Sequence, residues 1–413
     1  MNAEPSDTPS PGPSLGRDYR TCALIGTGHF LSHFYMLCLP PLFLLWRDEF
    51  DVSYAMLGLA IALMSGTTAL LQTPVGFLVD RHGARPFLVG GTLLMALSIA
   101  AMAFVTDFRW ILALAVLSGV GNSVIHPADY AILAGSIRKE FMGRAFALHT
   151  FTGNLGFALA PPAIAMLAPA FGWRTALLAV GLLGLPVVGA ILWQSRALGE
   201  QVKPRAAAAG DSLRLLRSKP ILAFFLFFLL SAMAGSGVSA FLITVLGKLW
   251  DTPIAVASLT LTGYMAGATA GVLVGGWVAD KRQSHLLGFV VALTVAAMAL
   301  LLSLGLVPWA EWALPPVAIL AGLCLGASRT PRDVMLKEAC PPGEIGKVFG
   351  FVSAGLPLGS ALMPVPLGLL LDGGHPGAVL PVVAALLALS LLCAGGARSL
   401  AASRGRAGMQ PAE

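Results

Sequence analysis

Charged residues are scarce in this 413-residue chain: Asp, Glu, Lys and Arg together make up 11% of it, whereas 57% is hydrophobic. A soluble domain usually carries about a quarter charged residues, so the composition excludes an ordinary soluble enzyme. A membrane-spanning helix takes about 20 apolar residues. We therefore expect a membrane protein that is apolar nearly throughout and leaves no room for a soluble catalytic domain.

Cysteine is also scarce, which bears on metal and redox chemistry. The five cysteines are scattered and never form a C-x-x-C pair, so a disulfide framework, a zinc site or a redox pair is not expected. No metalloprotease motif, nucleophile elbow or paired acidic metal site appears either. We expect no enzymatic activity, no cofactor and no metal centre.

The formal net charge is +6, which raises the question of a nucleic-acid partner. The basic residues, however, lie in short clusters between apolar runs and not on one surface. They therefore indicate membrane topology, and no nucleic-acid partner is expected.

Twelve apolar runs follow one another along the chain. Their length predicts helices, because lipid leaves only helices or closed barrels able to satisfy the backbone. The predicted fold class is an all-α integral membrane protein with twelve transmembrane helices in two pseudo-symmetric six-helix bundles. The runs cover residues 21–46, 55–79, 86–105, 110–136, 142–168, 174–194, 220–247, 254–279, 285–306, 313–336, 345–371 and 376–397.

The connections between these runs define the expected domains. Residues 1–20 are rich in Pro, Ser and Gly and are typical of a disordered cytoplasmic tail, not of a signal peptide. A polar, charged cytoplasmic linker at 195–219 separates an N-terminal bundle, 21–194, from a C-terminal bundle, 220–397. Residues 398–413 form a second cytoplasmic tail.

Orientation follows from the basic residues in the connections. Twenty of 24 fall on one side of the predicted membrane. Because Lys and Arg are enriched in cytoplasmic connections, both termini are expected in the cytoplasm.

The two halves repeat a pattern. A shift of about 200 residues lays Gly76 and Asp80 on Gly276 and Asp280, and shifts of 203 and 204 align further Gly, Pro and Asp positions in the same order. Two homologous six-helix halves in parallel orientation, with a binding site between them near the midplane, are typical of secondary transporters.

The loop after the second run reads G-F-L-V-D-R-H-G-A-R from Gly76 to Arg85 and resembles the G-x-x-x-D-R-x-G-R-R signature of the major facilitator superfamily. The H-F-L-S-H pattern at 29–33, the run 121–127 and G-N-L-G at 153–156 resemble the fosmidomycin-resistance type of efflux transporter. The resemblance covers residues 20–398. It implies alternating access, and a central cavity lined by the first, fourth, seventh and tenth helices.

The loop motif is interpreted as a conformational latch. A glycine allows close helix packing, an aspartate can meet the positive end of a neighbouring helix, and arginines can pair with acidic groups or lipid phosphate. The alternative is that the basic residues only set topology. The predicted latch consists of Gly76, Asp80, Arg81, Gly83, Arg85, Gly276 and Asp280.

Polar side chains inside spans are costly unless they face a cavity or a partner, so they are the candidates for substrate binding and coupling. The spacing predicts Asn122, His126 and Asp129 on one face of a helix that Pro127 bends, with a second bend at Pro331. The predicted substrate-binding and coupling residues are His29, His33, Asn122, His126, Asp129, Tyr130, His149, Asn154, Arg329, Arg332 and Asp333.

Two interpretations of these charges stay open. Asp129 and Asp333 can neutralise Arg329 and Arg332 in a purely structural network. Alternatively, one arginine binds a substrate anion bidentately while an aspartate or histidine takes a proton. We expect Asp333 to neutralise Arg329 one turn away, leaving Arg332 for the substrate or for Asp129. For His29 and His149 a packing role is favoured.

These patterns predict a secondary active transporter that moves a small organic, anionic solute or drug by proton-coupled efflux. It is expected to work as a monomer in the lipid bilayer of a bacterial-type plasma (inner) membrane. Proton-coupled uptake of an organic anion, a carboxylate or phosphonate, is the alternative; a non-transporting receptor is a distant one.

Overall fold

The computed structural model describes residues 15–138, 141–194, 218–281, 285–339, 348 and 351–407. These residues are helical or lie in short connections, and none of them forms a strand. Within them, 12 helical stretches are long and apolar enough to cross a membrane, from Leu15–Phe50 to Pro376–Gly395. The predicted all-α class and the twelve spans are confirmed.

The first six spans contain the helices α1 (Leu15–Leu37), α2 (Phe43–Phe50), α3 (Tyr54–His82), α4 (Ala84–Ala101), α5 (Phe108–Ser123), α6 (Ile125–Ser136), α7 (Met142–Phe171), α8 (Trp173–Leu182) and α9 (Gly184–Gln194). The other six contain α11 (Lys219–Trp250), α12 (Ile254–Lys281), α13 (Leu286–Leu306), α14 (Leu314–Ala339), α16 (Gly355–Leu362), α17 (Pro364–Asp372) and α18 (Pro376–Ala407).

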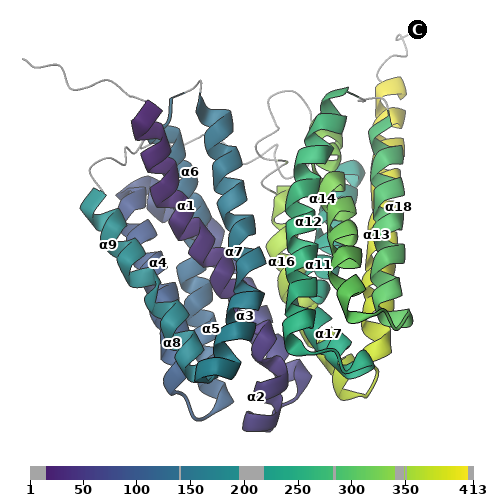
Figure 1. Ribbon diagram of the computed structural model, residues 1–413. Coiled ribbons are helices and arrows are strands. Elements are labelled where there is room, and N and C mark those ends of the chain that lie inside the picture. Colours follow the sequence, from purple (N-terminus) through teal and green to yellow (C-terminus); the bar gives the residue numbers. More distant parts are fainter. Residues whose placement is uncertain are drawn as a thin grey trace, which may run out of the picture.

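These helices form two groups that stand side by side, α1 to α9 in one and α11 to α18 in the other (Figure 1). The first turn of α1 and the last turns of α18 lie at the same end of the molecule. An even number of spans requires this arrangement. The predicted linker, 195–219, lies outside the described residues except for 218 and 219. Residues 15–20 of the predicted first tail belong to α1, and residues 398–407 of the predicted second tail belong to α18, so these two helices extend beyond the predicted spans. Residues 1–14 and 408–413 lie outside the described residues.

The outer surface carries large apolar side chains that water would not favour. Trp193 is 85% exposed, Trp312 80% and Phe104 73%. Large apolar side chains exposed on many helices are typical of a protein surrounded by an apolar medium. It fits the lipid bilayer that the composition predicts.

The fourth span is broken in its middle. α5 ends at Ser123 and α6 begins at Ile125, two residues before Pro127. A proline ring clashes with the carbonyl group four residues earlier, and a helix that begins anew just before Pro127 relieves that clash. At the second predicted bend, Pro331, α14 continues through the proline.

The two groups of helices pack together through α3 against α16 and α17, and through α7 against α12. Glycine permits the approach at two points. A Cβ atom at Gly58 would lie 2.5 Å from the carbonyl oxygen of Pro364, and one at Gly368 would lie 2.5 Å from that of Tyr54. Both contacts lie toward the end of the molecule away from α1's first turn (Figure 1).

Candidate functional site

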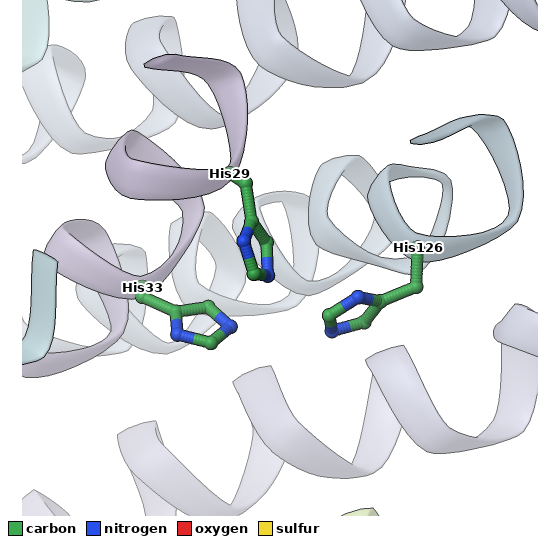
Figure 2. A group of neighbouring side chains, drawn as sticks. All are labelled: His29, His33 and His126. Atoms are coloured by element: carbon green, nitrogen blue, oxygen red, sulfur yellow. The ribbon is translucent and has the colours of Figure 1, made fainter. Parts of the chain in front are cut away.

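Four histidines from three helices meet inside the first group of helices, and we call them the histidine cluster: His29, His33, His126 and His149. His29 and His33 stand one turn apart in α1, with ring centroids 4.4 Å apart. His126 lies in the first turn of α6, 5.1 Å from His29. Figure 2 shows the rings of His29, His33 and His126 around one common space.

His149 of α7 ties this cluster to a buried carboxylate. Its ring stacks on that of His29 at 3.7 Å, and its Nε2 donates to Asp129 Oδ2 at 2.9 Å. The backbone oxygen of His149 in turn accepts a hydrogen bond from His29 Nδ1 at 2.7 Å. Asp129 is 0% exposed, and among the described residues its Oδ1 has no hydrogen-bond partner. The chain of contacts therefore runs from Asp129 through His149 to His29.

Glycine in α7 makes room for the cluster. A Cβ atom at Gly153 would lie 2.4 Å from Cε1 of His29 and 2.8 Å from Nδ1 of His33. A Cβ atom at Gly156, one turn on, would lie 2.2 Å from the backbone oxygen of Phe30. Both positions therefore require glycine for α1 and α7 to pack this closely. In the sequence, both glycines stand out only through their resemblance to a family pattern.

The other predicted residues of these helices lie in different surroundings. Tyr130 packs on His126 at 5.9 Å and is 47% exposed. Asn122 lies before the break, in α5, and its side-chain amide donates to Thr68 Oγ1 at 3.2 Å and approaches Met36 Sδ at 3.6 Å. A break of one residue, Val124, separates α5 from α6, and Val124 itself has right-handed helical φ and ψ. Asn154 is half-buried in α7.

The expected charge pairing in α14 is wrong. Asp333 pairs with its neighbour Arg332, Nη2 to Oδ1 at 2.9 Å, and not with Arg329. The Arg332 guanidinium also lies 3.8 Å above the ring of Phe228, a cation–π contact that fixes its direction. Asp129, the other expected partner of Arg332, is instead bound by His149.

Arg329 is consequently the arginine left for another anion. It is exposed, and within the described part of the chain it forms no ion pair or hydrogen bond. The ionisable groups that interact with it electrostatically are Tyr264, Arg332 and Asp333. An exposed guanidinium of this kind suits a carboxylate or phosphonate through its planar fork.

The predicted latch lies between α3 and α4 and at the end of α12. Gly83 has φ +88°, a conformation that favours glycine and lets α4 begin directly after α3. Arg81 is exposed and Arg85 half-buried. A Cβ atom at Gly76 or Gly276 would meet nothing within 4 Å, so neither marks a close helix contact here. The side chains of Asp80 and Asp280 lie outside the described residues, and the latch stays a prediction.

One contact between the halves was not anticipated from the sequence, and we call it the Asp372 clasp. The carboxylate of Asp372, at the end of α17, accepts the backbone N–H groups of Tyr54 and Ala55 at 2.7 and 2.9 Å. It also pairs with Arg47 of α2 at 3.1 Å. The carboxylate thus caps the N-terminus of α3 from the opposite half. An aspartate followed by two glycines was the only signal in the sequence.

Among the described residues, twelve apolar helical stretches in two packed groups, with a buried polar cluster in one group and an exposed arginine in the other, are typical of a multi-pass membrane transport protein. The family model of the Major Facilitator Superfamily matches residues 25–313 and 224–405, and the chain belongs to this superfamily. It is a family of transporters and not of enzymes, as the sequence predicted.

Individual relatives are distant but cover most of the chain. The chain is 25% identical to the fosmidomycin resistance protein of Escherichia coli over 89% of its own length and 90% of the relative's. It is 26% identical to the multi-drug resistance efflux pump PmrA of Streptococcus pneumoniae, over 75% and 77%. These matches confirm the predicted resemblance to transporters of efflux type.

Solved structures show the same fold. A bacterial homolog of the human lysosomal transporter Spinster, in an inward-facing and unoccupied conformation, superposes with a TM-score of 0.76. The identity is 15%, and the match covers 97% of this chain and 100% of the other. At this identity the match establishes the fold alone.

Proposed function

We propose that this protein exports a small organic anion by proton-coupled alternating access. It works as a monomer in a bacterial-type plasma (inner) membrane, with both termini in the cytoplasm. The names of two relatives, a fosmidomycin resistance protein and a multi-drug efflux pump, support the direction of transport.

The observation that carries the coupling is the buried pair of Asp129 and His149. A carboxylate that is 0% exposed, with one oxygen held by an imidazole and the other without a donor among the described residues, is poorly compensated when charged. Uptake of a proton by this pair relieves the burial of charge. The pair lies against His29 and therefore against the polar interior of the first half.

The anion is bound by Arg329 in the other half. It is the arginine of α14 without an ionic partner among the described residues, whereas Asp333 already neutralises Arg332. Solute and proton therefore occupy opposite halves. A rigid-body movement of one half against the other then changes access to both sites together.

The Asp372 clasp and the glycine contacts between α3 and α17 close the end away from the termini. With the termini in the cytoplasm, that end is the outer one, and the structure represents an inward-facing state.

The test measures coupling separately from binding, in proteoliposomes with labelled fosmidomycin and a set of carboxylates and phosphonates as probes. Asp129→Asn is expected to abolish uphill transport driven by a pH gradient. Counterflow needs no net proton movement, and it is expected to continue in the same variant. Asp48→Asn, at an exposed aspartate of α2, is the matched control and should leave both measurements unchanged.

Pumping by Asp129→Asn at the wild-type rate would refute the coupling role of this pair. Absence of counterflow of every probe by the wild-type protein would refute organic-anion transport itself. Accumulation of a probe on the side that corresponds to the cytoplasm would favour uptake over efflux.

A further inference from the structure

We propose that His29, His33 and His126 bind a divalent transition-metal ion of the Zn²⁺, Ni²⁺ or Co²⁺ type. This goes beyond the transport function above and does not rest on it. It also departs from the sequence-based expectation of no metal centre, which considered the cysteine spacing and catalytic motifs but not histidines brought together from separate helices.

The geometry comes close to a coordination site. One ring nitrogen from each of the three histidines lies within 4.8 Å of the other two. A tetrahedral ion with Zn–N distances of about 2.0–2.1 Å holds such nitrogens about 3.4 Å apart, so each ring has to move by less than about 1 Å. Figure 2 shows the three rings turned toward the same space.

The tautomer of His29 favours a metal. A carbonyl oxygen only accepts hydrogen bonds, so His29 Nδ1 must carry the proton that it shares with the backbone oxygen of His149 at 2.7 Å. The lone pair is therefore on Nε2, which is buried and has no partner among the described residues. A ring N–H directed to a backbone carbonyl while the other nitrogen is left open is the usual arrangement of a metal-binding histidine.

The other two rings also have buried nitrogens without a partner. Nδ1 of His33 and Nδ1 of His126 make no hydrogen bond to any described residue. Buried polar atoms normally have hydrogen-bond partners, so an unpartnered buried nitrogen on each of three neighbouring rings is unusual. A cation in the space between the three rings would take one lone pair from a nitrogen of each ring.

The surroundings balance the charge of such an ion. Asp129, joined to the cluster through His149, places a carboxylate with an unpartnered oxygen beside it. Three imidazoles and no thiolate suit borderline ions such as Zn²⁺, Ni²⁺, Co²⁺ and Cu²⁺ better than Mg²⁺ or Ca²⁺. Three protein ligands also leave a coordination position open, as in sites that take up water or a further anionic ligand.

The test measures metal binding by the purified full-length protein, carrying a purification tag without histidine. After treatment with a chelator, the protein is titrated with Zn²⁺ in competition with a chromophoric chelator, and with Co²⁺ followed by its visible absorption. We expect one Zn²⁺ per chain, and a Co²⁺ spectrum of the tetrahedral, nitrogen-ligated type.

Three variants assign the site. His33→Asn and His126→Asn are each expected to weaken Zn²⁺ binding about tenfold or more, the range seen when metal-site contacts are lost. The matched control is His375→Asn, at an exposed histidine between α17 and α18 that should not affect binding. Size-exclusion profiles and melting temperatures establish that all three variants fold.

Zn²⁺ binding of wild-type strength in both cluster variants would overturn the proposal, as would an octahedral, oxygen-ligated Co²⁺ spectrum in the wild type. Since the readout is binding and not transport, a negative result leaves organic-anion export untouched. Conversely, a failure of anion counterflow does not affect the test of the metal site.

Discussion

The Asp372 clasp allows a prediction whose size follows from its contacts. Replacing Asp372 by alanine removes two hydrogen bonds from the first turn of α3, at 2.7 and 2.9 Å, and the ion pair with Arg47. A hydrogen bond to a charged group contributes about 1.5–3 kcal/mol, and an exposed ion pair about 0.2–1 kcal/mol. The side chains of Arg47 and Asp372 are 36% and 21% exposed, so the low ends apply. We expect a loss of about 3 kcal/mol from the clasped state.

Such a loss shifts the balance between closed and open states of this end. Each 1.4 kcal/mol is a factor of ten, so the ratio of closed to open molecules falls about 100-fold. The assay is the distance between spin labels attached at Asp48→Cys and His375→Cys, two exposed positions near this end in opposite halves. In Asp372→Ala the short-distance population is expected to decline and a longer one to appear.

The matched control is Asp107→Ala. Asp107 also caps a helix, α5, accepting the backbone N–H of Arg109 at 2.8 Å, but both residues belong to one half. Its loss costs stability without a shift in the distance distribution. If Asp372→Ala folds and yet shows the wild-type distribution, the clasp does not hold the halves together and the reasoning fails.

Three further predictions concern the interior and the latch. Gly153→Ala should lower the melting temperature and weaken Zn²⁺ binding, because its Cβ would lie 2.4 Å from Cε1 of His29. Gly90→Ala, whose Cβ would meet nothing within 4 Å, should be nearly neutral, and equal melting temperatures of the two variants would contradict the packing argument. Arg329→Ala should remove anion-induced thermal stabilisation while Arg332→Ala retains it, and the reverse result would restore the role first expected for Arg332. Asp80→Asn should insert and fold yet transport more slowly, and an unchanged rate at matched protein density would reject the latch.

The spans were predictable because they depend on quantities local to the sequence. A run of about 20 apolar residues predicts a helix wherever it stands, and the repeat of Gly76 and Asp80 at Gly276 and Asp280 revealed two related halves. The break before His126 also has a local cause, because Pro127 cannot continue a helix. Pro331 shows the limit of that rule, since α14 continues through it.

The pairing of side chains was harder to predict, because the spacing of two residues along a helix does not fix the direction in which a long side chain points. An i,i+4 spacing suggested Arg329 with Asp333, but the long side chain of Arg332 reaches its own neighbour while its guanidinium rests on Phe228. Phe228 belongs to another helix, α11, so the sequence of α14 alone contains no sign of it.

The histidine cluster and the clasp depend on packing between distant segments. The pattern at His29 and His33 was visible, but its meeting with His149 requires α1 to lie close to α7, which Gly153 and Gly156 permit. Asp372 lies more than 300 residues from the backbone that it caps. A single sequence does not show which of its distant segments pack against one another.

The first span runs from the histidine cluster to the clasp without a long interruption: α1 carries His29 and His33, and α2, which begins at Phe43, carries Arg47. Anything that binds better when the clasp is made must, by thermodynamic reciprocity, strengthen the clasp by the same factor. If Zn²⁺ binds the closed state more tightly than the open one, the ratio of the two affinities therefore equals the factor by which saturating Zn²⁺ raises the ratio of closed to open molecules. Two equilibrium measurements at opposite ends of one span thus have to agree.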